Sequence, residues 1–141
     1  MGALTVVFDT NLYIGAMGWK STSWQCLVAA FVTDVDLVGS EEILDEIQRV
    51  MQYDRLPFTP EEQSKYPKYV RYEMTVVEPR NNLNVISEDP DDDMFLEAAI
   101  EADAEYIVSN DDHLLDLDTF QGIDICTPAE FLAQDDTPSL G

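Results

Sequence analysis

Basic residues are scarce in this 141-residue sequence, whereas acidic residues are abundant. Seven Lys and Arg residues stand against 29 Asp and Glu residues, which gives a formal net charge of −22. Six of the seven basic residues lie between Arg49 and Arg80. Nucleic-acid-binding proteins normally carry basic surfaces, so this balance argues against a large phosphate-binding face. We expect a domain from a high-salt cytoplasm, where ions screen the repulsion among surface carboxylates.

Long apolar runs and closely spaced cysteine pairs are also missing, and no secretory leader is expected. The longest apolar run, residues 26–32, is too short to span a bilayer. The start of the sequence lacks the basic region of a secretory signal. Cys26 and Cys126 lack CxxC spacing, so we expect buried free thiols in a reducing compartment. These features predict a cytoplasmic protein without a membrane partner.

Short apolar strands alternate with helical patterns along the chain. Because 45% of the residues are hydrophobic, disorder does not explain the acidity. This order predicts an α/β fold, a three-layer α/β/α sandwich with a central, mainly parallel sheet. We expect one domain over residues 1–133 and a polar, frayed tail over residues 134–141. Strands are expected at residues 4–8, 35–39, 84–87, 105–109 and 123–126.

Helix starts carry recognisable capping signals. Ser40 should cap one helix, and Thr10 or Asn11 should cap the first. The run Thr59-Pro60-Glu61-Glu62 predicts a capping box and a helix that Pro67 should kink or split. The basic and aromatic residues between positions 65 and 72 favour an amphipathic surface helix over a rim that contacts nucleic-acid phosphates and stacks bases.

Asp9 directly follows the apolar segment Leu4–Phe8. Such an unbroken apolar run is typical of a strand buried on both faces of a parallel sheet. Open α/β sheets place their ligand crevice at the carboxyl ends of such strands. A functional carboxylate therefore explains Asp9 better than a helix N-cap does.

Glu46 lies in a helix whose apolar positions form one stripe. At about 100° per residue, Glu46 falls at the edge of that stripe, whereas Glu42 and Asp45 point further away. We expect Glu46 to be half-buried beside the sheet. The apolar positions are Ile43, Leu44, Ile47, Val50 and Met51.

Four acidic positions fall near strand ends or helix starts: Asp9, Glu46, the run 89–93 and Asp111. Each alone is compatible with helix capping, and for Asp89, Asp91 and Asp93 capping is the preferred interpretation. Together they should meet at one edge of the sheet, where carboxylates repel unless a cation binds. Oxygen ligands suit Mg²⁺ or Mn²⁺, which can activate water near a phosphate.

Other metal sites fit the sequence less well. An EF-hand beginning at Asp89 would need Gly where Met94 stands and Glu where Ile100 stands. A zinc site is disfavoured because His113 is the only histidine and the cysteines are not clustered. We expect His113 to be a helix-surface or partly packed residue rather than a catalytic one.

Four segments resemble, in order, the successive motifs of the PIN domain family. They are residues 6–11, 40–47, 89–99 and 106–115, and residues 127–132 resemble its closing segment. The resemblance implies a metal-dependent endoribonuclease, often the toxin of a toxin–antitoxin pair. Residues 53–80 carry no such motif.

The resemblance assigns the family's four acids to Asp9, Glu46, Asp92 and Asp111. Periodicity turns Asp93 outward but does not separate Asp91 from Asp92, so the choice of Asp92 rests on the resemblance alone. Supporting roles fall to Asn11, Ser109 and Asp93, of which the first two should orient ligands.

These assignments predict hydrolysis of RNA with Mg²⁺, or with Mn²⁺, as cofactor. Glu46 would serve as a metal ligand or accept the proton of the attacking water. The resemblance further implies products with 5′-phosphate and 3′-hydroxyl ends. Arg49, Arg55 and Arg71 are the expected RNA contacts. A small basic antitoxin and a second copy of the chain, in a homodimer, are the expected protein partners. The alternatives are a PIN-like protein-binding module and a housekeeping RNA-processing nuclease without an antitoxin.

Overall fold

The computed structural model describes residues 4–17, 21–32, 34–80 and 92–133, and its centre is a six-stranded sheet. The strand order is β3-β2-β1-β4-β6-β5, and all neighbours are parallel except β5 and β6. The predicted α/β class with a mainly parallel sheet is therefore confirmed. The strands are β1 (Leu4–Phe8), β2 (Val35–Ser40), β3 (Thr75–Val77), β4 (Tyr106–Val108), β5 (Thr119–Phe120) and β6 (Ile123–Cys126).

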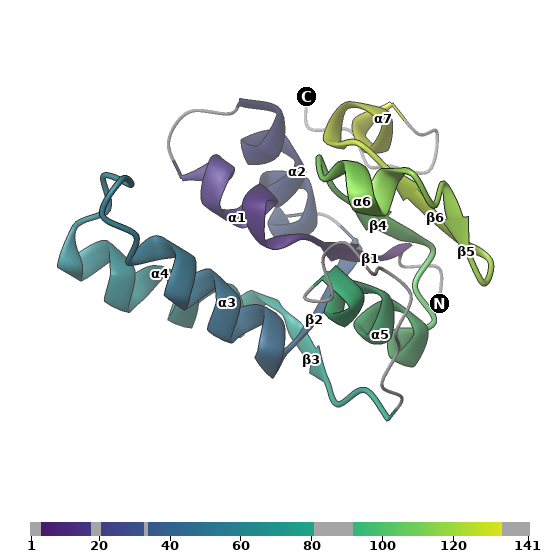
Figure 1. Ribbon diagram of the computed structural model, residues 1–141, viewed down its shortest axis with the longest axis horizontal. Helices are drawn as coiled ribbons and strands as arrows, with labels where there is room; N and C mark the ends of the chain where they lie inside the picture. Colours follow the sequence, from purple (N-terminus) through teal and green to yellow (C-terminus); the bar gives the residue numbers. More distant parts are fainter. Residues whose placement is uncertain (1–3, 18–20, 33, 81–91, 134–141) are drawn as a thin grey trace.

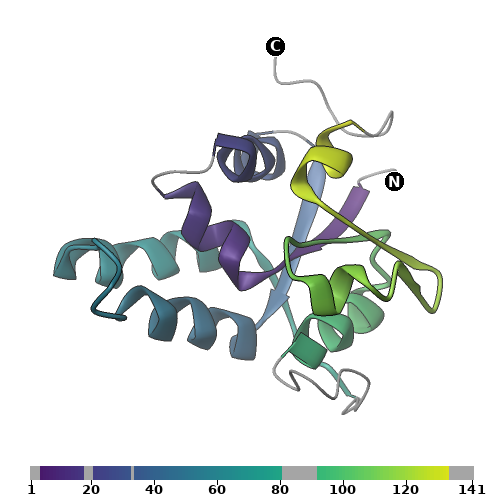
Figure 2. The same ribbon diagram turned by 45° about the horizontal axis from the view of Figure 1, so that its top comes forward.

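Helices flank this sheet, as a three-layer sandwich requires. In Figure 2, α1, α2 and α7 lie on one side of the sheet and α5 on the other. The helices α3 and α4 form a hairpin that extends away from the rest of the molecule (Figure 1). The helices are α1 (Thr10–Ala16), α2 (Ser21–Val32), α3 (Glu41–Met51), α4 (Pro60–Glu73), α5 (Asp93–Ala102), α6 (Asp112–Leu115) and α7 (Pro128–Leu132).

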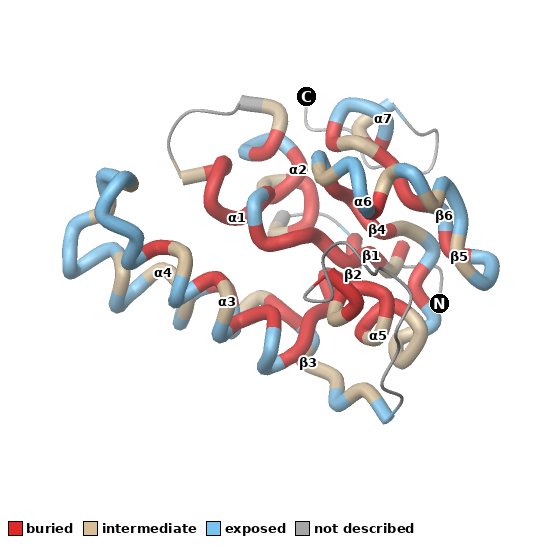
Figure 3. Tube along the Cα trace, in the orientation of Figure 1, coloured by how far each residue is buried: buried red, intermediate tan, exposed pale blue. Residues whose placement is uncertain are grey.

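The core lies around β1 and β4, which helices cover on both faces (Figure 3). On one face, Phe131 of α7 packs edge-on against Phe8, with 5.9 Å between ring centroids, and contacts Tyr106 at 6.2 Å. On the other face, α5 buries Phe95 and Leu96. A strand enclosed in this way has apolar side chains at successive positions, which explains the unbroken apolar run that precedes Asp9.

The register of the sheet brings the carboxyl ends of the central strands level. Phe8 pairs with Val108, and Val108 pairs with Cys126. The ladder continues one step further, because Asp9 N donates to Val108 O at 3.1 Å and Ser109 N donates to Cys126 O at 2.9 Å. Asp9 and Ser109 therefore emerge from neighbouring strands at the same edge of the sheet.

The predicted helix caps are mostly confirmed. The Ser40 side chain accepts a hydrogen bond from Ile43 N, and the capping box of Thr59 and Glu62 is present. The first helix differs from the prediction, because its cap is Asp9 rather than Thr10 or Asn11. Asp9 holds this position since it ends β1 in an extended conformation, whereas Thr10 already belongs to the helix.

Pro67 was predicted to kink or split its helix, and the split is wrong, because α4 runs through the proline as one helix. Tertiary contacts on either side of the proline hold the helix despite one missing backbone donor. The Tyr66 hydroxyl donates to Tyr13 O at 2.8 Å, and Val70 is fully buried. The sequence patterns do not predict β3 and β5, which are too short for a detectable alternation. The predicted strand at residues 84–87 and the tail from residue 134 lie outside the described residues.

Candidate functional site

Asp9 is a buried carboxylate at the end of β1. Its side chain is 3% exposed, and Oδ1 accepts a hydrogen bond from Leu12 N at 3.0 Å. Its second oxygen accepts a hydrogen bond from the Ser109 hydroxyl. Burial is the largest influence on the Asp9 pKa and raises it to about 6, while the hydrogen bonds from Ser109 and Leu12 act in the opposite direction. The ionised form is therefore costly unless positive charge is supplied nearby.

Ser109 links Asp9 to the next acid along the sheet edge. The residue is fully buried, and its hydroxyl donates to Asp9 while it accepts a hydrogen bond from Asp111 N at 2.8 Å. The negative charge of Asp111 also contributes to the raised pKa of Asp9. Asp9 and Asp111, 102 positions apart in the sequence, are thus held in place by a single hydroxyl group.

Asp92, Asp111 and His113 form a cluster, which we call the acid–imidazole cluster. Each contributes one potential ligand atom, and these atoms all lie within 4.8 Å of one another. Asp111 caps α6, since its Oδ1 accepts a hydrogen bond from His113 N at 2.9 Å. Asp92 precedes α5 and is 7% exposed, but its side chain makes no capping hydrogen bond. Helix capping therefore accounts for Asp111 but not for Asp92.

The acid–imidazole cluster suits a divalent cation. Two ligand atoms that are each about 2.1 Å from a small divalent ion can be at most about 4.2 Å apart, so a slight contraction of the cluster would complete the site. Two carboxylates and one imidazole supply the oxygen and nitrogen donors that such ions accept. Among the described residues, this 4.8 Å group contains neither Asp9 nor Glu46.

Glu46 lies on α3, and its side chain is 17% exposed, so it is half-buried as predicted. Its Oε1 accepts a hydrogen bond from the hydroxyl of Thr10, the residue after Asp9. Its Oε2 lies 3.1 Å from Arg49 Nη2 in an ion pair. The chain therefore connects Glu46 to Asp9 through Thr10, and Arg49 offsets part of its charge.

The remaining predicted site residues are scattered. Asn11 is exposed in the first turn of α1. Asp93 is only 4% exposed, so its predicted outward orientation is wrong. An outward orientation presupposes one covered face of the helix, whereas α5 contacts α3 as well as the four strands β1, β2, β3 and β4. Arg55 lies over the Tyr53 ring at 5.0 Å, and Arg71 makes two hydrogen bonds to Glu41.

His113 lies on the surface of α6 as predicted, with 42% of its side chain exposed. What the sequence patterns do not reveal is that its Nδ1 faces two carboxylates, 3.7 Å from Asp111 Oδ1 and 3.9 Å from Asp92 Oδ2. The only available signal was its place in the same helical turn that Asp111 caps. The contribution of Asp92 comes from another helix and is invisible in the local sequence.

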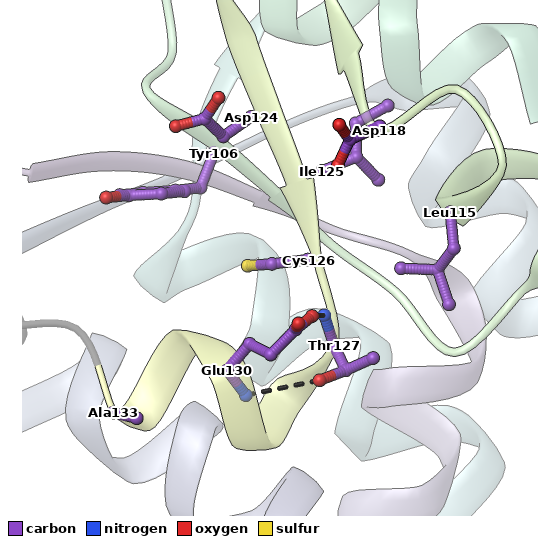
Figure 4. Close-up of a pocket in the computed structure, with 9 residues that line it drawn as sticks. All are labelled: Tyr106, Leu115, Asp118, Asp124, Ile125, Cys126, Thr127, Glu130 and Ala133. Atoms are coloured by element: carbon purple, nitrogen blue, oxygen red, sulfur yellow. Dashed lines mark hydrogen bonds between the residues drawn. The ribbon is translucent and has the colours of Figure 1, made fainter.

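A separate hollow of about 550 Å³ lies beside β6 (Figure 4). Its lining includes Tyr106, Asp124 and Cys126, but none of the predicted site residues. The Glu130 side chain at its rim accepts a hydrogen bond from Thr127 N and so completes a helix cap. The buried thiols of Cys26 and Cys126 are free, as predicted, and burial raises the pKa of each to about 12.

The sequence model of the PIN domain family matches residues 5–113. This match extends from β1 into α6 and includes Asp9, Glu46, Asp92 and Asp111. No curated protein matches the chain. Among the described residues, every helix is too short or too polar to cross a membrane.

Proposed function

The chain belongs to the PIN domain family, and from this membership we propose that it is a metal-dependent endoribonuclease. PIN domains are generally nucleases and typically bind divalent metals. The observation that carries the proposal is the meeting of Asp92 and Asp111 from the starts of two different helices, beside the buried Asp9. Such a concentration of carboxylates is unfavourable without a cation.

We assign metal binding to Asp92 and Asp111, with Asp9 positioned behind them through Ser109. Mg²⁺ is the proposed ion, and Mn²⁺ is the alternative. When bound, such an ion stabilises negative charge on the phosphate and lowers the pKa of bound water. Asp9 can join the metal ligands directly if its side chain turns away from Ser109, or it can act by fixing that hydroxyl and thereby Asp111.

Glu46 is the proposed acceptor for the proton of the attacking water. Its half-buried carboxylate accepts a hydrogen bond from the Thr10 hydroxyl, which fixes its position next to the end of β1. In the proposed reaction, a water oxygen forms a bond to phosphorus and the bond between phosphorus and O3′ breaks. One water proton passes to Glu46, the departing O3′ oxygen takes up a proton from solvent, and the products have 5′-phosphate and 3′-hydroxyl ends.

RNA contact is assigned to the basic residues of the α3–α4 hairpin. Arg49 pairs with Glu46, and Arg71 pairs with Glu41, so each must exchange a carboxylate for an RNA phosphate. Such exchange costs little for Arg71 and Glu41, which are both exposed, because surface ion pairs contribute little stability. Arg55, which lies over the Tyr53 ring, offers a cation beside an aromatic surface for a base.

More specifically, we propose that the protein is the toxin of a toxin–antitoxin pair. A small basic antitoxin would complement the negative charge of the domain and would place Arg or Lys side chains against Asp92 and Asp111.

The negative surface charge also supports a high-salt cytoplasm as the site of action. Raising KCl from low to molar concentration should therefore increase the melting temperature. Equal stability at both concentrations would contradict the proposed habitat.

The decisive experiment compares Asp111→Asn with the neighbouring Asp112→Asn. The Asp111 variant should lose metal-dependent RNA cleavage by about 100-fold or more, because it removes charge from the cluster. Asp112 is exposed in the same helical turn, so its variant should retain activity within about threefold. Circular dichroism checks that both variants fold.

Equal cleavage by the two variants would overturn the assigned site. Absence of cleavage by the wild-type protein with either Mg²⁺ or Mn²⁺ would favour a protein-binding module. Cleavage of RNA without growth arrest on expression would favour a housekeeping nuclease over a toxin.

A further inference from the structure

The imidazole of His113 faces the carboxylates of the acid–imidazole cluster without hydrogen bonding to them. Its Nδ1 lies 3.7 Å from Asp111 Oδ1 and 3.9 Å from Asp92 Oδ2. An N–H···O hydrogen bond is normally about 2.7–3.2 Å long. The Asp111 oxygen already accepts a hydrogen bond from the backbone of His113 at 2.9 Å. Direct bonding between the side chains therefore does not explain where the ring lies.

The two distances from His113 Nδ1 match the spacing of ligands around a shared ion, and all three potential ligand atoms of the cluster lie within 4.8 Å of one another. Both distances are below the limit of about 4.2 Å for two ligands on one small divalent cation. The atoms come from separate helices, with Asp92 at the start of α5 and the other two at the start of α6. Since 42% of the His113 side chain is exposed, water molecules can reach the site and complete the coordination.

We propose that His113 Nδ1 is a direct metal ligand, and that it makes the site prefer Mn²⁺ to Mg²⁺. This proposal rests on the proposed function to the extent that both use the cluster of Asp92 and Asp111. Mg²⁺ favours oxygen donors and keeps several water molecules, whereas imidazole is a better ligand for transition metals. A site made of two carboxylates and one imidazole therefore discriminates between two ions that an all-carboxylate site would bind more evenly.

The single histidine of the sequence permits a direct spectroscopic test. Untagged protein labelled with ¹⁵N-histidine carries the label at His113 alone. With Mn²⁺ bound at about pH 8, where imidazole is ordinarily neutral, pulsed electron paramagnetic resonance should detect hyperfine coupling between the ion and ¹⁵N. Unlabelled protein is the control, and it should instead show coupling between the ion and the ¹⁴N nucleus of the same imidazole. Stoichiometric Mn²⁺ binding without nitrogen coupling would overturn the proposal, and so would failure to bind Mn²⁺.

A pair of variants tests the metal preference independently of activity. His113→Gln should weaken Mn²⁺ binding about 10-fold or more, measured by calorimetry, while Mg²⁺ binding changes less than about threefold. Asp112→Asn alters an exposed residue in the same turn and should leave the ratio of the two affinities unchanged. Both affinities are measured in molar KCl, because the salt screens the electrostatic effect of neutralising Asp112. An unchanged Mn²⁺ affinity in His113→Gln would contradict the proposal.

The two proposals fail in different ways. If Mn²⁺ binds with histidine coupling but RNA is not cleaved, His113 is a ligand and the nuclease proposal is wrong. If Asp111→Asn abolishes RNA cleavage but the Mn²⁺-loaded protein lacks nitrogen coupling, the nuclease proposal stands and the role of His113 is wrong.

Discussion

Polar side chains are buried at the carboxyl ends of β1 and β4 but exposed on the α3–α4 hairpin. At the strand ends, Asp9 and Ser109 are buried, and burial raises the pKa of Asp9 to about 6. On the hairpin, Glu41 and Arg71 are exposed and pair with each other, and this contact lowers the pKa of Glu41. The free energy of folding should therefore depend strongly on individual polar groups at the strand ends and weakly on those of the hairpin.

The largest effect on stability is expected for Ser109→Ala. This change removes a donor to the buried Asp9 and an acceptor for Asp111 N, which should cost about 3 kcal/mol at neutral pH. Urea unfolding without divalent metal measures the loss. Ser40→Ala is the matched control, since Ser40 is equally buried but only caps α3, and it should cost about 1 kcal/mol. Equal losses in both variants would show that the contact of Ser109 with the buried Asp9 carboxylate adds nothing to the stability of the protein.

Asp9→Asn should stabilise the metal-free protein while impairing the proposed metal site. Because the folded-state pKa of Asp9 is raised from 3.8 to about 6, the folded protein binds this proton more tightly than the unfolded chain. The stability that Asp9 contributes is therefore greatest below about pH 4 and is lost as the pH rises to about 6, by up to about 3 kcal/mol.

The variant should accordingly be more stable than wild type above pH 6 and no more stable below pH 4. Urea unfolding at several pH values, in a chelating buffer, measures both curves. Parallel curves for the two proteins would show that Asp9 does not titrate as its burial implies. Asp45→Asn, at an exposed position on α3, is the control and should leave the pH dependence of stability unchanged.

Thr59→Ala should have an intermediate effect within the hairpin. The Thr59 hydroxyl accepts a hydrogen bond from Glu62 N, and the Glu62 side chain accepts one from Thr59 N. Losing the threonine half of this capping box should cost about 1 kcal/mol, measured by urea unfolding. Thr59→Ser retains the hydroxyl and should restore most of the stability. A loss above that of Ser109→Ala would reverse the order of the two regions.

Glu41→Gln should have the smallest effect. Glu41 and Arg71 are both largely exposed, so water replaces the ion pair when one partner is neutralised. The melting temperature should stay within about 2 °C of wild type at molar salt. A markedly larger decrease would show that this pair holds α3 and α4 together.

The sequence patterns identify the strand ends and most of the helix caps. The apolar run before Asp9 and the capping signal of Ser40 are local features that survive in the folded protein. The error at Pro67 and the buried Asp93 have a different origin. In both cases contacts from distant segments outweigh the local preference, through Tyr66 at the hairpin and through the packing of α5.

The residues of the candidate site also differ in how far the local sequence predicts them. Asp9 and Glu46 follow from strand and helix periodicity, because an acid at a strand end or a stripe edge is visible in a short window of sequence. The choice of Asp92 required the family resemblance. The position of His113 facing Asp92 could not be predicted locally, since 20 intervening residues separate the two in the sequence.

The sequence by itself determined the alternation of strands and helices, the acidic surface and the residues that end each buried strand. These properties depend on hydrophobic periodicity and charge, which are written into neighbouring residues. Only the tertiary structure decided that one serine hydroxyl joins Asp9 to Asp111 and that an imidazole meets two carboxylates. The reason is that strand register and helix packing, rather than proximity in the chain, set the distances between these atoms.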